Sequence, residues 1–420
     1  MPGHAVITGI GFITSIGLDR PEVIESLRRG KTGVAPYDFG GRTNHPVRVA
    51  APVKGFFVDS PSWREWSWPA RYEIPREAIR GLPPHGVYAF CAVEQALTDA
   101  GLSAADIEGP ETGLFCASAG SPYLLHHYMS EMEASEFERG HPMGVVSSIA
   151  GTLNFNLAAH YHITGAVAGF VSACTSSSHA LGYAVDEIRL GRQERVIVVG
   201  AEDLNAEADL PFAAMRALST NPDPATASRP FDVNRDGFVP TGGGVALIVE
   251  SAELAQRRGA RVLADVIGWG QAADGYSVAS SHPMGRGLQR AMERALRDAG
   301  IGASELDYIN AHATSTPAGD RSEAIALKAV LGEGAATKIS STKGLTGHGL
   351  SMSGAMEAAF CVLALTEGFA PGNDHLQKPD PETSGLNLPT MATPLNARYV
   401  MNNASGFGGS NVCHILRAPR

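Results

Sequence analysis

Residues 96–108 read ALTDAGLSAADIE, and residues 295–307 read ALRDAGIGASELD. The two segments keep a constant offset of 199 residues, and most of their differences are conservative. Each has apolar residues at helical spacing and stops at a glycine, Gly101 or Gly300, which suits the left-handed conformation that follows a helix. Two unrelated amphipathic helices can share such a stop, but here the match continues beyond the glycine. The repeat therefore predicts a duplicated chain.

A strand-like run follows each copy of the repeat, at residues 112–117 and 307–311. Other short β-favouring runs lie at 5–9, 196–200, 245–249 and 398–402. Helical patterns separate them, and continuous apolar strands indicate a sheet that is buried on both faces. We expect an α/β protein with two similar halves, residues 1–255 and 256–420. The stretch 36–85, rich in Pro, Trp and Arg, is expected to be a surface excursion.

The charge balance excludes one large class of partners. Lys and Arg number 33 against 43 Asp and Glu, a formal net charge of −10, whereas nucleic-acid binding needs a basic surface. No apolar run is expected to reach the ~18 residues of a membrane span, and the N-terminus lacks the basic and long apolar regions of a signal peptide. We therefore expect a cytoplasmic protein that binds neither nucleic acid nor membrane.

Several familiar motifs are absent. The cysteines are odd in number and scattered without a CxxC pair, so neither a disulfide framework nor a zinc site is predicted. Gly9 and Gly11 begin a dinucleotide-binding motif, but its third glycine is replaced by Thr14. The run Gly30-Lys31-Thr32 lacks the first glycine of a phosphate-binding loop, because that position is Glu25.

Cys174 stands at the start of a predicted helix. Residues 171–190 read VSACTSSSHALGYAVDEIRL, in which Leu181, Val185 and Ile188 fall on one helical face. The free N–H groups and partial positive charge of a helix start favour a thiolate, lower its pKa and can bind an oxyanion. A buried structural cysteine is the alternative, and this segment alone leaves both open. The other cysteines, inside strand or helix patterns, are interpreted as structural: Cys91, Cys116, Cys361 and Cys413.

Two later segments supply nitrogen bases. His312 follows a predicted strand and precedes a run of hydroxyl residues, and Lys343 and His348 precede a predicted small-residue helix at 350–366. A lone His or Lys is more often a surface or core residue. A cysteine nucleophile with histidines far away in sequence is nevertheless the general pattern for covalent acyl chemistry.

A glycine cluster lies near the C-terminus. Residues 402–411 read NNASGFGGSN, between two strand-like runs. Such a turn lets backbone N–H groups approach a ligand closely. An ordinary hairpin is the alternative.

In combination, these segments resemble the β-ketoacyl-[acyl carrier protein] synthases, the condensing enzymes of fatty-acid and type II polyketide assembly. The matching stretches are SACTSSSHA, NAHATSTPAGD, STKGLTGHGLSMSGAMEA and SGFGGSN, with AVITGIG near the start and ASRPFDVNRDGFV at 227–239. The resemblance covers essentially the whole chain, is weakest at 36–85 and 120–150, and is greatest to the synthase I-like branch. It implies a thiolase fold, two duplicated halves in α-β-α-β-α layers, packed as a dimer.

The resemblance also implies a role for each motif residue. Cys174 would be the nucleophile that carries the acyl chain, and His312 and His348 would stabilise the enolate formed when a malonyl group loses CO₂. Lys343, together with Glu323, would support the histidines. The other implied site residues are the oxyanion donor and gate Phe407, the pantetheine-binding Thr314 and Thr316, and the pocket residues Phe238, Ser405, Gly406 and Gly408.

The implied reaction needs no metal and no redox cofactor, because loss of CO₂ generates the carbanion. Substrates would arrive on the phosphopantetheine arm of an acyl carrier protein, and the second subunit would be a copy of this chain or a chain-length-factor-like homologue. The sequence departs from the family's pattern around the pocket. Ala313 and Ser405 replace a glycine and an aromatic residue, and the GHLLGAAG-like stretch carries Ser351 and Met352.

Two other functions stay open. A catalytically silent subunit that sets chain length typically lacks the nucleophile, whereas Cys174 is present here. A thiolase acting on coenzyme A esters would place a second catalytic cysteine in a CxG-type loop near the C-terminus, where Cys413 lies in a strand-like run instead. Within the condensing class, the altered gate favours a polyketide or polyene pathway over primary fatty-acid synthesis.

Overall fold

The computed structural model describes residues 4–41 and 45–419. The protein is built around a ten-stranded mixed sheet in the order β10-β9-β13-β14-β8-β1-β7-β6-β4-β5. These strands are β1 (Ala5–Ile13), β4 (Thr112–Ala117), β5 (Val167–Phe170), β6 (Arg195–Glu202), β7 (Gly243–Ser251), β8 (Ala264–Ala273), β9 (Tyr308–Asn310), β10 (Lys338–Ser340), β13 (Tyr399–Gly406) and β14 (Ser410–Arg417). Two short ribbons pair β2 (Ala35–Pro36) with β3 (Val49–Ala50) and β11 (Phe369–Ala370) with β12 (Thr393–Pro394).

The helices alternate with these strands along the chain. They are α1 (Arg20–Arg29), α2 (Arg76–Ile79), α3 (Pro84–Ala100), α4 (Pro122–Ala134), α5 (Gly144–Ser148), α6 (Thr152–His160), α7 (Ser176–Arg189), α8 (Ala206–Asp209), α9 (Pro211–Ala214), α10 (Ala252–Arg257), α11 (Arg286–Ala299), α12 (Pro317–Leu331), α13 (Lys343–Thr346) and α14 (Ser353–Glu367). The strands predicted from sequence are all present, and most extend one to four residues further than their apolar runs.

The sheet consists of two five-stranded halves with the same topology. If the five strands of each half are numbered 1 to 5 in chain order, both halves have the spatial order 3-2-4-5-1. The first half is β5-β4-β6-β7-β1, and the second half is β10-β9-β13-β14-β8. Two parallel pairings are followed by two antiparallel ones in both halves. The halves join where β1 pairs antiparallel with β8. The predicted boundary after residue 255 falls inside α10, which links the halves.

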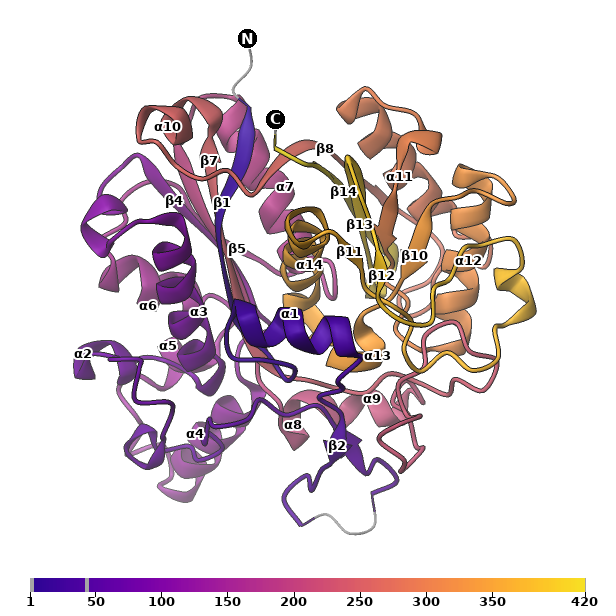
Figure 1. Ribbon diagram of the computed structural model, residues 1–420. Helices are drawn as coiled ribbons and strands as arrows, with labels where there is room; N and C mark the ends of the chain where they lie inside the picture. The colour runs from indigo at the N-terminus through magenta and orange to yellow at the C-terminus, as the bar shows by residue number, and fades with distance from the viewer. Residues whose placement is uncertain (1–3, 42–44, 420) are drawn as a thin grey trace.

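Five layers result, alternately helical and β (Figure 1). Helices α7 and α14 pack against each other in the middle, between the two halves of the sheet. Helix α3 covers the outer face of the first half, and α11 and α12 cover that of the second. Both faces of the sheet are therefore buried, which explains the continuous apolar strands.

The repeated helices end and pack alike. Both α3 and α11 stop at a left-handed glycine with φ of 67°, Gly101 and Gly300, as the repeat predicts. A side chain on Gly11 of β1 would collide with the backbone oxygen of Ala92 in α3. Gly270 of β8 lies in the same way against α11. The glycines of the incomplete dinucleotide motif thus allow a helix to lie directly on a strand.

Two expectations need correction. The stretch 36–85 is not merely superficial, because Phe56, Trp66 and Tyr72 are buried in the core beneath α3. Residues Leu350–Glu367 do form a helical stretch long and apolar enough to cross a membrane by length and composition, against the expectation from sequence. That stretch includes α14, and 83% of it is buried inside the protein, which identifies it as the central core helix.

Candidate active site

Cys174 lies in the short connection between β5 and α7, at the inner end of a cavity. The residue before it, Ala173, has φ of 53°, a conformation that alanine rarely adopts and that costs on the order of 1–3 kcal/mol. Ser176 stabilises this turn, because its hydroxyl donates to the Ala173 carbonyl at 2.6 Å and accepts from the Ser172 N–H at 2.8 Å. The first turn of α7 thus supports a strained loop that presents the sulfur.

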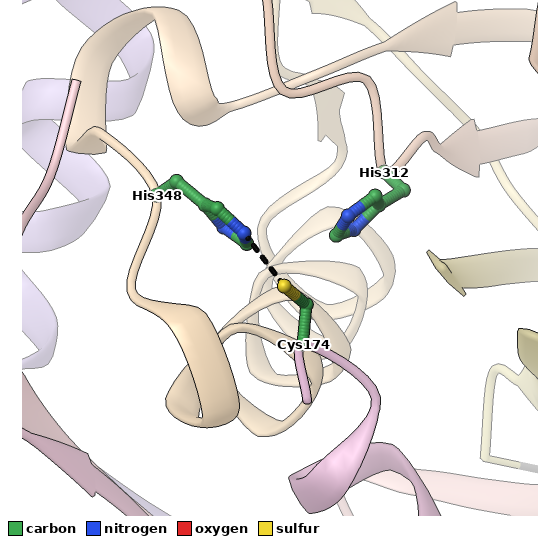
Figure 2. A group of neighbouring side chains, drawn as sticks. All are labelled: Cys174, His312 and His348. Carbon is green, nitrogen blue, oxygen red and sulfur yellow. Dashed lines mark hydrogen bonds between the residues drawn. The ribbon is translucent and has the colours of Figure 1, made fainter. Parts of the chain in front are cut away.

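Two histidines from the second half of the chain face this sulfur (Figure 2). His348 Nε2 lies 3.0 Å from Cys174 Sγ, and its Nδ1 lies 3.0 Å from the Ser353 hydroxyl at the start of α14. The rings of His312 and His348 are nearly perpendicular, with centroids 5.3 Å apart. The structure therefore brings together the three residues that the sequence motifs singled out.

His312 is held from two sides. It follows β9, and Glu323 of α12 accepts the backbone N–H groups of His312 and Ala313 at 3.0 and 2.6 Å. Lys343 Nζ lies 3.4 Å from His312 Nδ1. If Lys343 donates this hydrogen bond, the neutral ring carries its proton on Nε2, where it is available as a donor.

Lys343 and Glu323 contact the surroundings of His312 in different ways. Lys343 forms a fully buried ion pair with Glu357 of α14, whereas Glu323 contacts the backbone beside His312. Burial raises the pKa of Glu357, and the Lys343 ammonium pulls it down. A cation buried without a carboxylate would be strongly destabilising, so Glu357 is what allows Lys343 to stand at this position.

The protonation states also differ from expectation. Burial raises the pKa of the Cys174 thiol to about 12, although the nearby Lys343 charge opposes the rise. Burial and the Lys343 charge hold the pKa of both histidines, His312 and His348, well below the usual range. The resting site is therefore a neutral thiol beside two neutral imidazoles, and the sequence-based expectation of a lowered thiol pKa is not met. His348 Nε2 is in place to accept the thiol proton.

The cavity in front of Cys174 has a volume of about 340 Å³. It is lined by Cys174, both histidines and most of the other predicted site residues: Phe238, Thr314, Thr316, Glu323, Ser405, Gly406 and Phe407. The hydroxyls of Thr314 and Thr316 are 3.0 Å apart. Lys343 and Gly408 do not line the cavity; Gly408, with φ of 79°, shapes the glycine-rich turn.

Aromatic rings border this cavity. Phe238 meets His348 edge-on, with ring centroids 5.1 Å apart. Phe212, just after the start of α9, packs against both Phe238 and Phe407, at 5.5 and 5.8 Å. Phe407 remains 37% exposed, so it sits at the mouth and not in the core.

The glycine-rich turn approaches the nucleophile closely. A side chain on Gly406 would come within 3.1 Å of the Cys174 N–H and 3.3 Å of Ala173 Cβ. The adjacent Ser405 lines the cavity together with Cys174 and donates to Asn411 Oδ1 at 2.7 Å. A small polar side chain thus lies beside the reactive cysteine.

Sequence reasoning missed three contributors. Glu357 is the one carboxylate in the stretch 353–364 of α14, among apolar and small residues, which is a readable signal for a buried ion pair. Ser353, the hydroxyl beside His348, lies in the same quoted motif. Phe212 carries no sequence signal, because only the chain's path over the cavity places its ring beside Phe407.

Comparison with known proteins identifies the family of this chain. The N-terminal domain of β-ketoacyl synthases matches residues 4–255, and their C-terminal domain matches residues 263–377. The chain therefore belongs to the β-ketoacyl synthase family.

Individual relatives extend the match over the full length. The chain is 35% identical to 3-oxoacyl-[acyl-carrier-protein] synthase 1 of Escherichia coli strain K12, over 99% of this chain and 98% of that protein. A β-ketoacyl synthase structure from Burkholderia phymatum superposes with a TM-score of 0.91 and 31% identity, covering 100% of both chains. The ishigamide ketosynthase/chain length factor gives a TM-score of 0.88 and 28% identity over 100% of both chains. The fold is thus the thiolase fold of the ketosynthases.

Proposed function

We propose that this chain is an acyltransferase that catalyses decarboxylative Claisen condensation on carrier-protein thioesters. An acyl group carried by Cys174 is joined to a malonyl-[acyl carrier protein], which yields a 3-oxoacyl-[acyl carrier protein] and CO₂. The observation that supports this most directly is the 3.0 Å contact between Cys174 Sγ and His348 Nε2 at the inner end of the cavity. A thiol beside a neutral imidazole is the arrangement of an activated nucleophile.

In the first half-reaction the Cys174 proton passes to His348 Nε2 as the sulfur attacks the acyl thioester. The backbone N–H groups of Cys174 and Phe407 are the proposed donors to the developing oxyanion, and the close approach of Gly406 to the Cys174 nitrogen supports this role. The departing pantetheine thiolate takes the proton back from His348. In total, the acyl–pantetheine thioester is broken and an acyl–Cys174 thioester is formed.

In the second half-reaction a malonyl thioester occupies the cavity. His312 and His348 donate Nε2–H groups to its carbonyl oxygen, where negative charge builds up as CO₂ leaves. His348 acts here as its Nε2–H tautomer, in which the Ser353 hydroxyl donates to Nδ1, whereas the Nδ1–H tautomer accepts the thiol proton in the first half-reaction. Neutral imidazoles suit this task because both rings have lowered pKa values and remain donors without carrying charge. The resulting carbanion attacks the acyl carbon on Cys174, the sulfur leaves as a thiolate, and one proton taken up from solvent restores the thiol.

The substrate arm enters along the hydroxyl-lined wall of the cavity. Thr314 and Thr316 are placed to hydrogen-bond the phosphopantetheine, and Phe407, at the mouth of the cavity, is placed to gate it. Phe238 shields the imidazole of His348 from water. This scheme uses no metal or redox cofactor.

The chain's own features argue against the two alternative functions. A silent partner subunit carries out no acyl transfer, so it does not need a strained loop that holds a cysteine at hydrogen-bond distance from a histidine. For a coenzyme A thiolase the second cysteine would have to reach the cavity, but Cys413 is fully buried within β14 and does not line it.

We place the enzyme in type II polyketide or polyene synthesis, with fatty-acid synthesis as the other candidate pathway, and in the cytoplasm. The small polar Ser405 at the gate and the similarity to a ketosynthase/chain length factor pair support this choice. The second subunit is a copy of this chain or a chain-length-factor-like homologue, and the acyl carrier protein is the third partner.

Mass spectrometry of the carrier protein tests the proposal. The purified chain is incubated with malonyl-[acyl carrier protein] and a panel of acyl primers, and the products are compared with those of a Cys174→Ala variant. We expect 3-oxoacyl products with the native chain and none with the variant. Equal condensation by the variant, or no product with any primer and any homologous partner, would contradict the proposal.

A further inference from the structure

The active site contains a set of metal-ligand atoms. Within the described residues, one group of three or more His, Cys, Asp and Glu side chains is arranged to hold a metal ion: Cys174, His312 and His348. One ligand atom from each lies within 4.8 Å of the other two. All three point toward a common centre (Figure 2). One thiol and two imidazoles are ligands that Zn²⁺ prefers in proteins.

We propose that these three side chains bind Zn²⁺ reversibly and that the bound ion inhibits the enzyme. Zinc bonds of about 2.0–2.3 Å place neighbouring ligand atoms of a tetrahedron about 3.5 Å apart. The observed spacings, from 3.0 Å up to 4.8 Å, therefore require only small side-chain movements. The cavity leaves the fourth position open to water, as in zinc sites with three protein ligands.

Binding and the condensation reaction compete for the same sulfur. Zn²⁺ replaces the thiol proton, which is released to solvent, and a Zn–S bond forms in which the sulfur lone pair is no longer free to attack a thioester. Cys174 in its acylated form has no thiolate to offer. The acyl-enzyme is therefore protected from the metal, and the free enzyme is the form that is inhibited.

The surroundings favour one histidine and oppose the other. The Ser353 hydroxyl can accept a hydrogen bond from His348 Nδ1–H, and in that tautomer Nε2 has a free lone pair for the metal. Lys343 Nζ lies 3.4 Å from His312 Nδ1, so a metal ion must bind His312 through Nε2. The ring proton then moves to Nδ1, and Lys343 loses its hydrogen bond to His312 and keeps its ion pair with Glu357. This cost makes the site one of reversible binding and not a permanent structural site.

Direct binding tests the proposal without relying on condensation. Titration of the metal-free chain with ZnCl₂ in a calorimeter is expected to show one site, and Co²⁺ is expected to give the absorption of a thiolate–cobalt bond. Cys174→Ala should abolish that absorption, and His348→Ala should weaken Zn²⁺ binding at least about tenfold. His126→Ala, which alters an exposed histidine outside the site, is the matched control and should bind as the native chain does.

A second test needs no substitution. The native chain is alkylated at Cys174, and we expect the alkylated protein to have lost the Zn²⁺ site. The proposal is overturned if Zn²⁺ binding is unchanged after alkylation and in Cys174→Ala, or if Co²⁺ gives no thiolate absorption with the native chain. These readouts are independent of the condensation reaction, so they stand or fall separately from the proposed function.

Discussion

The reactive sulfur of this protein is activated by a neighbour more than by its helix. Cys174 lies just before α7, yet burial raises the pKa of its thiol to about 12. The nearby Lys343 charge lowers this pKa, but desolvation is the larger effect. In the proposed mechanism the thiolate is therefore formed during attack, by proton transfer to His348, whose Nε2 lies 3.0 Å from the sulfur.

Thiol labelling checks this view of Cys174. We expect iodoacetamide to modify Cys174 first, because the other four cysteines are fully buried. Since the pKa is raised above the working pH, the thiolate fraction and the labelling rate should rise as the pH is increased from 7 to 10. Peptide mapping by mass spectrometry measures both. Labelling spread evenly over all five cysteines would contradict the assignment.

The two histidines make a second prediction at this scale. His312→Ala and His348→Ala should each lower the rate of malonyl decarboxylation by at least about 100-fold, because each removes a donor from the developing enolate. Release of ¹⁴CO₂ from labelled malonyl-[acyl carrier protein] measures the rate. His126→Ala serves as control, since this histidine is exposed and outside the cavity. Normal CO₂ release from both variants would remove their proposed role.

Ser353 gives a third residue prediction. Its hydroxyl can donate to or accept from His348 Nδ1, so it supports the ring both before and after proton transfer. Ser353→Ala should reduce kcat about tenfold, in line with the loss of one buried hydrogen bond, with little change in KM. Ser353→Thr should restore activity if the hydroxyl positions the ring. Loss in both variants alike would indicate that packing alone matters here.

At the scale of elements, the duplicated helices α3 and α11 pack against their strands in the same way, although they lie far apart in the sequence. Glycines in β1 and β8 allow α3 and α11 to lie against the strand backbone, with Gly11 facing Ala92 and Gly270 facing Ala291. The alanines of the repeat are small for the same reason. The repeat is thus visible in sequence because close helix–strand contact restricts both partners to small residues.

Substitution of one of these glycines tests that explanation. Gly11→Ala places a methyl group against the backbone oxygen of Ala92, which cannot move without shifting α3. We expect a loss of at least about 1–3 kcal/mol of unfolding free energy, the usual cost of overpacking. Gly302→Ala is the control, because its φ is −88° and the nearest atoms are 3.8 Å away. Equal urea midpoints for the two variants would contradict the argument.

At the scale of the whole molecule, one edge of the sheet has no partner strand among the residues that the structure describes. Strand β5 is the last strand in its half and alternates exposed and half-buried residues, with Val167 43% exposed. Val171, just beyond it, is 68% exposed, and exposed apolar side chains continue on α5 and α6. Such an edge invites pairing with another strand. Two copies related by a two-fold axis can pair it antiparallel.

Self-association is the corresponding prediction. Light scattering of the purified chain should give about twice its mass of 44.0 kDa. Val171→Asp should shift the mass toward the monomer, because it places a charge in the apolar contact. Val278→Asp, at an exposed valine outside β5, α5 and α6, is the matched control. A monomeric native chain would instead indicate a homologous partner as the second subunit.

By itself the sequence determined the duplicated α/β architecture, the strand positions and the Cys174, His312 and His348 motifs. These follow from local patterns: apolar periodicity, glycine stops and short motifs each depend on residues near one another in the chain. The expected surface position of 36–85 was wrong because burial there depends on what the rest of the chain leaves uncovered.

Only the tertiary structure decided how the motif residues act together. It paired Lys343 with Glu357, placed Ser353 behind His348, and raised the pKa of the thiol that the helix start was expected to lower. Each outcome depends on desolvation and on contacts between elements far apart in sequence. Desolvation acts through everything that surrounds a group, so no local pattern can specify it.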